Sequence, residues 1–150
     1  MTMNLATETI AQVRGEIEVL LQRHFDELAQ HKGVQVLNPL WHQYQALENE
    51  RSLAVFTARK DGALVGYSVF FLNWNLHYKD LLQAMNDVVF IDKPHREGSA
   101  GLKLLRYSEQ ALKELGCRKI AWHVKTAQDW GPILKRMGYA PEETIWSRTV

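Results

Sequence analysis

The chain has 150 residues, of which 46 % are hydrophobic and 23 % charged, and its formal net charge is +1 with the histidines neutral. These values are typical of one globular domain with a full core, spanning residues 1–150. Because positive and negative charges nearly balance, there is no electrostatic reason to expect nucleic acid or an anionic membrane as the main partner.

The single cysteine, Cys117, excludes a disulfide within the chain, so the fold does not require an oxidising compartment. Its place between Gly116 and an apolar run predicts a buried structural thiol. Residues 1–12 lack the basic start and apolar stretch of a signal peptide. No run of about 18 apolar residues is present to cross a membrane. We therefore expect a cytoplasmic protein.

The first part of the chain is expected to be helical. Apolar side chains recur at helical spacing over residues 8–31, which predicts a helix with one buried stripe. His24 lies on or beside that stripe, where packing is its simplest role. Gly33 is positioned to end this helix, and Pro39 opens a shorter helix that continues to about Glu50.

The period then changes to that of strands. Leu53–Arg59 and Leu64–Leu72 are rich in Val, Phe, Tyr and Leu, and Asp61-Gly62 lies between them. This dipeptide favours the two-residue turn that matches strand twist, so an antiparallel hairpin is predicted. Residues 73–84 are polar and aromatic and are expected to form a loop. Asp87–Asp92 is predicted to be a central strand buried on both faces.

A glycine-containing loop follows this strand and opens a helix to about Leu115. Lys119–Lys125 is predicted to be a strand, Asp129 to cap a short helix, and Tyr139–Arg148 to form a last strand. The predicted order is helix, helix, hairpin, strand, helix, strand, helix, strand. This order indicates an α/β (α+β) domain with a mixed sheet and helices packed on it.

The loop after the central strand carries the clearest chemical signal. Gly98 and Gly101 allow close backbone approach, and the first turn of the helix presents N–H groups at the positive end of its dipole. That geometry binds a diphosphate. Arg96 supplies a cation, and Ser99 either caps the helix or donates its hydroxyl. A plain strand-to-helix turn explains the spacing equally well. The glycine patterns of Rossmann and P-loop nucleotide sites are absent.

Residues 96–101, Arg-Glu-Gly-Ser-Ala-Gly, resemble the acetyl-CoA pyrophosphate loop of the GNAT family of N-acetyltransferases. That loop runs Gln or Arg, two residues, Gly or Ala, one residue, Gly or Ala. Arg96 and Gly101 fit, and Ser99 stands where glycine is usual. In the shifted register Gly98 and Ala100 fit, but His95 replaces the Gln or Arg. The element order and Met137-Gly138-Tyr139 also resemble that family. The pair His77-Tyr78 and the three residues His123-Val124-Lys125 are similar to those of a subgroup often encoded in bacteriophage genomes.

The resemblance implies a GNAT acyl-CoA N-acyltransferase fold with a mainly antiparallel sheet, splayed central strands and flanking helices. Acetyl-CoA would lie in a V between Val88–Asp92 and Lys119–Lys125, and an amine would attack the thioester directly, with no covalent enzyme intermediate. Asp129 takes about the place where relatives carry an Asn near the thiol. The implied cofactor-binding residues are Phe90, Ile91, Arg96, Glu97, Gly98, Ser99, Ala100, Gly101 and Asp129.

Direct attack requires a base for the amine and benefits from an acid for the thiolate. In many relatives a Tyr four residues before the last Gly is the acid, and Leu134 occupies that place here. Tyr78 and Tyr139 are the alternative acids. The candidate bases are His77, Asp80, Asp87 and His123, although a strand start, an exposed loop or a sheet side chain would also explain them. The predicted catalytic set is His77, Tyr78, Asp80 and Asp87.

The acceptor is expected to be an amine of a small molecule or a protein, with acetyl-CoA as co-substrate. No histidine spacing typical of a zinc site is present, so no metal is expected. Relatives often dimerise, which allows a homodimer. The alternative function is a catalytically weak or inactive GNAT-fold protein that binds a host or partner protein. Leu134, Ser99 and Glu97 favour this alternative. A binder of other nucleotides is disfavoured by the absent motifs.

Overall fold

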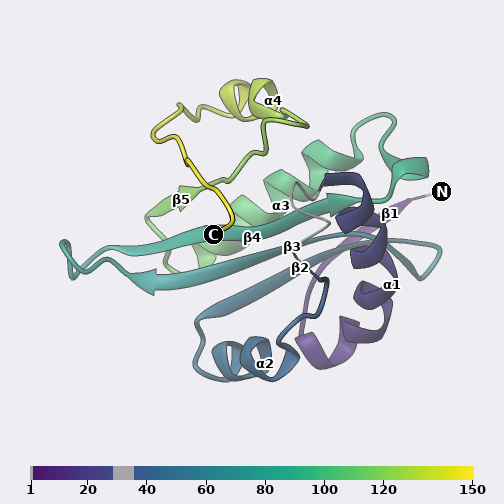
Figure 1. Cartoon of the computed structure of the whole chain (residues 1–150), viewed down its shortest axis with the longest axis horizontal. Helices are drawn as coiled ribbons and strands as arrows, with labels where there is room; N and C mark the ends of the chain where they lie inside the picture. Colours follow the sequence, from purple (N-terminus) through teal and green to yellow (C-terminus); the bar gives the residue numbers. More distant parts are fainter. Residues whose placement is uncertain (1, 29–35) are drawn as a thin grey trace.

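The computed structural model describes residues 2–28 and 36–150. The expected helix end at Gly33 lies outside the described residues. The chain forms a five-stranded sheet with the order β1-β2-β3-β4-β5 (Figure 1). The strands are β1 (Met3–Glu8), β2 (Leu53–Lys60), β3 (Ala63–Trp74), β4 (Leu82–Ile91) and β5 (Lys119–Ala121). The first four strands pair antiparallel, and β5 pairs parallel to β4. The predicted mixed sheet, mainly antiparallel with flanking helices, is therefore confirmed.

Helices cover both faces of this sheet. They are α1 (Ile10–Leu28), α2 (Trp41–Asn49), α3 (Ala100–Glu114) and α4 (Gly131–Arg136), with a 3-10 turn, η1, over Lys93–His95. Adjacent residues of β2 face opposite ways, since Phe56 packs with Leu104 of α3 and Val55 packs with Val13 of α1. This period of two divides the core into two layers. The α1 and α2 layer and the α3 layer thus enclose the sheet on either side (Figure 1).

The hairpin between β2 and β3 forms as predicted. Lys60 pairs with Ala63, which leaves Asp61 and Gly62 as a two-residue turn. Both residues have positive φ, 51° and 83°, as a turn that follows the strand twist requires. The buried thiol is confirmed as well, because Cys117 is 6 % exposed and burial raises its pKa.

The strands of the structure differ from the sequence predictions at four places. Met3–Glu8 forms the unpredicted edge strand β1, paired to β2, with Met3 and Leu5 packed on the α3 layer. The predicted loop 73–84 is shorter, because β3 continues to Trp74 and β4 begins at Leu82. These extended arms of the hairpin project beyond the core, so polar residues such as Asn73 and Gln83 pair within them. Their polarity does not prevent pairing, because strand pairing joins backbone groups.

The third difference concerns the end of the chain. Tyr139–Arg148 contains no strand, and residues 141–150 are exposed. Trp146 is 90 % exposed, so no partner buries the apolar side chains that suggested a strand. Lys119 and Glu142 form an ion pair at 2.9 Å between β5 and this segment. The strand predicted over Lys119–Lys125 is also shorter, since β5 ends at Ala121.

Candidate active site

The central strands β4 and β5 separate where a side chain replaces backbone pairing. β5 pairs with β4 only through Gln83, Ala84 and Met85. The next residue, Asn86, is 4 % exposed, and its side-chain amide accepts a hydrogen bond from the His123 N–H and donates to the His123 carbonyl at 3.4 Å. An amide can do both because it carries a donor and an acceptor. Asn86 therefore bridges the point at which the two chain segments diverge.

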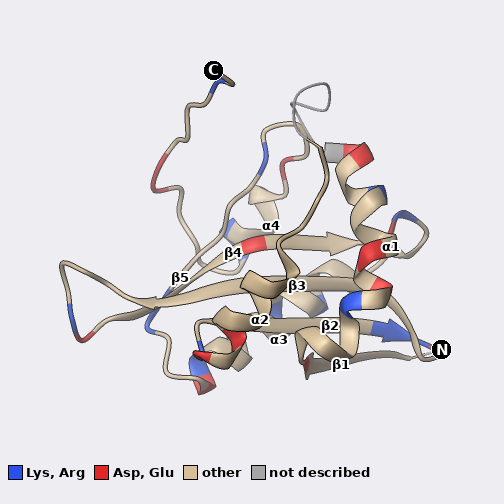
Figure 2. Ribbon diagram, turned by 60° about the horizontal axis from the view of Figure 1, so that its bottom comes forward, with Lys and Arg blue, Asp and Glu red and all other residues tan. Residues whose placement is uncertain are grey.

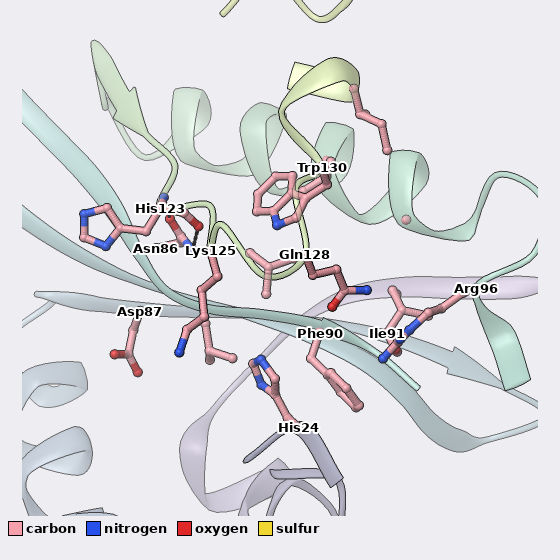
Figure 3. Close-up of a pocket in the computed structure, with 15 residues that line it drawn as sticks. His24, Asn86, Asp87, Phe90, Ile91, Arg96, His123, Lys125, Gln128 and Trp130 are labelled. Carbon is pink, nitrogen blue, oxygen red and sulfur yellow. Dashed lines mark hydrogen bonds between the residues drawn. The ribbon is translucent and has the colours of Figure 1, made fainter. Parts of the chain in front are cut away.

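A cavity of about 300 Å³ occupies the space between the diverging segments (Figure 3). One wall is β4, and the opposite wall is the segment that follows β5. The remaining walls come from α1, α3, α4 and the loop before α3. The lining residues are His24, Asn86, Asp87, Val88, Val89, Phe90, Ile91, Arg96, Gly101, Leu105, His123, Lys125, Gln128, Trp130 and Ile133. Beyond Met85, the described residues place no strand on the β5 side of β4, so its backbone edge is open to the cavity.

Asp87 enters the cavity because β4 bulges there. The β3–β4 register pairs Phe70 with Asn86 and Val69 with Val88, which leaves Asp87 without a partner. A bulge of this kind re-aims a side chain. Asp87 is the one acidic residue of β4 (Figure 2), and the Tyr44 hydroxyl of α2 donates to its Oδ2 at 2.6 Å.

The other three predicted catalytic residues lie elsewhere. His77, Tyr78 and Asp80 occupy the turn 75–81 at the tip of the β3–β4 hairpin, around a separate pocket beside Arg118. The N–H groups of His77 and Tyr78 donate to Oδ1 of Asn75, at 2.8 and 3.1 Å. The structure therefore brings Asp87 to the cavity and leaves these three outside its lining.

The alternative proton carriers differ in their surroundings. His123, another candidate base, lines the cavity. The Tyr139 hydroxyl donates to Glu109 at 2.7 Å, and burial is the main cause that raises the pKa of Tyr139 to about 12. Leu134, at the place of the usual acid, is buried in the core.

Arg96 in the glycine-containing loop is bound from two sides. Its Nε donates to the Ile91 carbonyl at 2.7 Å, and its guanidinium forms a double ion pair with Glu27 of α1, one contact at 2.6 Å. The same group lies over the Phe90 ring, 5.4 Å from its centroid. Arg23 of α1 pairs with Asp92 next to it. These contacts attach the end of α1 to the loop.

The rest of the loop leads into α3. Gly98 has φ 79°, a conformation that glycine adopts without strain. Ser99 is the N-cap residue, but its side chain makes no cap hydrogen bond. Of the nine predicted cofactor-binding residues, Phe90, Ile91, Arg96 and Gly101 line the cavity. Glu97, Gly98 and Ser99 belong to the adjoining loop, and Ala100 is the first residue of α3. Asp129 lies between two lining residues and accepts from the Gly131 N–H at 2.8 Å, so it supports the start of α4.

Sequence reasoning missed several residues of the cavity. His24 stacks on Phe90 with ring centroids 4.8 Å apart. Burial, and then the charge of Lys125, lower the pKa of His24 to about 4. Its helical position on the buried stripe was the available signal. Lys125, Gln128 and Trp130 reach the cavity because the chain leaves the sheet after Ala121, and no spacing in the sequence indicates that departure.

The fold and this cavity define an acyl-CoA N-acyltransferase architecture. The model of the acetyltransferase (GNAT) family matches residues 16–131. Since this is more than half of the chain, the chain belongs to the GNAT family of acetyltransferases. The expectation of an N-acetyltransferase is thereby confirmed at the level of the family. GNAT enzymes use acetyl-CoA as the acetyl donor.

Solved structures share the fold at low sequence identity. The ribosomal-protein-alanine N-acetyltransferase of Brucella melitensis biovar Abortus 2308 has a TM-score of 0.71 and 19 % identity, over 99 % of this chain and 97 % of that one. The aminoglycoside acetyltransferase HMB0005 from an uncultured soil metagenomic sample has a TM-score of 0.77 and 15 % identity, over 100 % of this chain and 99 % of that one. A predicted acetyltransferase of Clostridium acetobutylicum, solved with acetyl-CoA, has a TM-score of 0.70 and 12 % identity, over 99 % of this chain and 96 % of that one.

No curated protein matches the chain. Within residues 2–28 and 36–150, no helix has the length and apolar character needed to cross a membrane. The same residues contain no group of three or more His, Cys, Asp or Glu side chains placed to hold a metal ion.

Proposed function

We propose that the chain transfers the acetyl group of acetyl-CoA to a primary amine, of a small molecule or a protein, by direct attack. The observation that carries this proposal is the cavity between β4 and the segment after β5, which joins an open strand edge, a helix N-terminus and a carboxylate. Each of these three features serves a different part of the reaction.

The open edge of β4 supports binding of the pantetheine arm. Backbone N–H and C=O groups require partners, and beyond Met85 the described residues place no strand beside β4 on the cavity side, where the Ile91 carbonyl accepts from the Arg96 Nε. The amides of the pantetheine arm can occupy this edge as an added strand would. The N–H groups at the start of α3, with the helix dipole behind them, suit the pyrophosphate. The loop 96–101 would hold it there.

Asp87 is the residue that we propose as base. It lies at the bulge of β4, and it can accept the proton that an attacking ammonium must lose. His24 is a weaker candidate, because with a pKa of about 4 it has little affinity for a proton near neutral pH. His77, Tyr78 and Asp80, at the hairpin tip, are more suitably placed for contact with a large acceptor than with the thioester.

Two measurements test this function. Titration calorimetry with acetyl-CoA measures binding, and release of free coenzyme A thiol in the presence of primary amines measures transfer. Binding together with amine-dependent thiol release would support the proposal. No binding at millimolar acetyl-CoA would contradict it.

The second candidate is a GNAT-fold protein with little or no turnover that binds another protein. It is favoured by Arg96, whose guanidinium is engaged by Glu27, and by Leu134 at the place of the usual acid. Acetyl-CoA bound without transfer to a broad panel of amines would favour this second function. The proposal also includes a relation to the bacteriophage-encoded subgroup and a homodimer. It places the protein in the cytoplasm, which is the host cytoplasm if the protein is phage-encoded.

A further inference from the structure

The cavity wall nearest α2 is built around one carboxylate. Asp87 accepts a hydrogen bond from Tyr44 at Oδ2, and Oδ1 receives none from the described residues. A carboxylate accepts through both oxygens, so Oδ1 remains available to a donor from solution. Figure 3 shows the Asp87 side chain on the opposite side of His24 from Arg96 and the glycine-containing loop. The free oxygen therefore lies away from the loop proposed for the pyrophosphate.

Tyr44 is held firmly enough to fix the orientation of Asp87. Its ring packs against that of Trp41, with the ring centroids 5.9 Å apart. It is also stacked on the ring of Phe71, with the centroids 6.5 Å apart and an angle of 14° between the two ring planes. Burial, with the hydrogen bond to Asp87 next, raises the pKa of the Tyr44 hydroxyl well above its ordinary value. The hydroxyl therefore stays protonated at any working pH and acts as a permanent donor to Asp87.

A second polar group lies unpaired close to this pair. The Tyr67 hydroxyl of β3 is completely buried and has no hydrogen-bond partner among the described residues. Burial is the main cause of its raised pKa, and the charge of Asp87 contributes. A buried hydroxyl without a partner costs free energy unless a ligand or water meets it. Tyr67 does not itself line the cavity, so it is a buried, unpaired hydroxyl near Asp87.

The charges lining the cavity select against a ligand with several positive groups. Asp87 is the one carboxylate among the described lining residues. Arg96 is neutralised by Glu27, whereas Lys125 has no ion-pair partner in the described part of the chain. Figure 3 shows the Lys125 side chain directed toward the space between Asp87 and His24. Burial and the Lys125 charge keep His24 neutral near pH 7 by lowering its pKa to about 4.

We infer that this wall is an acceptor subsite for an amine with one positive charge: Asp87, held by Tyr44, receives the ammonium group, and Lys125 repels a second one. Tyr44 is a positioning residue in this subsite and does not itself touch the reacting atoms. The inference rests on the proposed acetyl transfer and names the acceptor class for it. Polyamines and other polycations would be poor acceptors.

Three amines of equal chain length test the charge rule: 1-aminopentane, 1,5-diaminopentane and 5-aminopentanoate. We expect kcat/KM for 1-aminopentane to exceed that for 1,5-diaminopentane at least about threefold after correction for its two amines, since like charges repel in this partly solvated site. Lys125→Gln should remove the difference. Lys79→Gln, which changes an exposed lysine at the hairpin tip, should preserve it. 5-Aminopentanoate should react at least as well as 1-aminopentane.

The positioning role of Tyr44 has its own test. Tyr44→Phe should lower kcat/KM for 1-aminopentane about tenfold, because a hydrogen bond to a charged group is lost. The KM for acetyl-CoA should not change. In an Asp87→Asn background the same substitution should have no further effect, since the oriented carboxylate is already gone. Tyr107→Phe is the matched control, because it removes a hydroxyl bonded to Thr7 at 3.3 Å outside the cavity lining.

Calorimetry with acetyl-CoA on every variant separates a failure of the proposed function from a failure of the acceptor subsite. A wild-type chain that does not bind acetyl-CoA contradicts the proposed function. A chain that binds acetyl-CoA but acetylates the mono- and diamine equally, or acetylates none of the three amines, contradicts the acceptor subsite. A Tyr44→Phe loss that persists in full in the Asp87→Asn background contradicts the positioning role.

Discussion

The two halves of β4 differ in what occupies their β5 side. Residues 83–85 pair with both β3 and β5, whereas residues 88–91 pair with β3 alone and line the cavity together with Asn86 and Asp87. Apart from Asp87, the residues of both halves are apolar or amide, so overall composition does not distinguish them. Two local features do: the Asn86 side chain, which ends the pairing, and the bulge at Asp87. Two adjacent residues thus open a cavity at the edge of an otherwise regular sheet.

The largest expected effect compares Asp87 with the carboxylate at the hairpin tip. Asp87→Asn should lower kcat/KM for an amine by roughly 100-fold or more, because a general base contributes about 10²–10⁴-fold. Acetyl-CoA affinity measured by calorimetry should stay within about twofold. Asp80→Asn, at the tip, should change kcat/KM less than about twofold by the same reasoning. Equal losses in the two variants would mean that the tip takes part in the chemistry.

Asn86→Ala tests whether the bridge keeps the two segments apart in a fixed geometry. It leaves the His123 N–H and C=O without protein partners, which should cost about 1–3 kcal/mol of unfolding free energy in urea titration. Acetyl-CoA affinity should fall with it. Asn75→Ala is the control, since Asn75 makes a comparable set of hydrogen bonds at the hairpin tip. It should cost similar stability and leave the affinity unchanged.

His24 gives the cavity a pH dependence that the paired half of β4 lacks. Burial lowers its pKa from 6.5 in the unfolded chain to about 4 in the folded one, so between these values the unfolded chain binds the extra proton. Stability should therefore be complete above pH 6.5 and fall as the pH is lowered toward 4, by about 2 kcal/mol from this group. Urea titrations at pH 7 and pH 4.5 should show a smaller loss for His24→Gln than for wild type. His42→Gln, at an exposed position of α2, should behave as wild type.

The smallest effect is expected at the end of the chain. Trp146 is 90 % exposed, and replacing it by Ser should change the unfolding free energy by less than about 0.5 kcal/mol. A loss of 2 kcal/mol or more would show that this segment is packed in solution, as the strand predicted over Tyr139–Arg148 requires.

The parts of the fold that sequence predicted well depend on local backbone chemistry. Asp61 and Gly62 form their turn because both adopt positive φ. Gly98 also adopts positive φ, in the loop before α3. β1 and the segment after Tyr139 depend instead on whether a distant strand is there to pair. The chain supplies β2 as a partner for Met3–Glu8 and none for the last residues. No local pattern reports that difference.

In the candidate site, too, the sequence predicted the features that depend on local position and missed those that depend on the path of the chain. Asp87 was predicted from its position at the start of an apolar strand, although the bulge that directs it was not. His77, Tyr78 and Asp80 were predicted with it because the loop before the central strand was expected to border the substrate cleft. In the structure β4 begins at Leu82, and a strand rises about 3.3 Å per residue, so Leu82 alone is roughly 16 Å from Asp87. Residues that are close in sequence therefore lie far apart in space when the chain between them is an extended strand.

The burial of Cys117 has a practical consequence. A sulfhydryl enclosed in the core, with its ionisation suppressed, reacts slowly with maleimides and with chromogenic aryl disulfides. Ellman-type detection of liberated coenzyme A would consequently run against a low protein background. A new cysteine placed on the hairpin tip would be the preferred point for attaching a fluorophore, without first removing the native one.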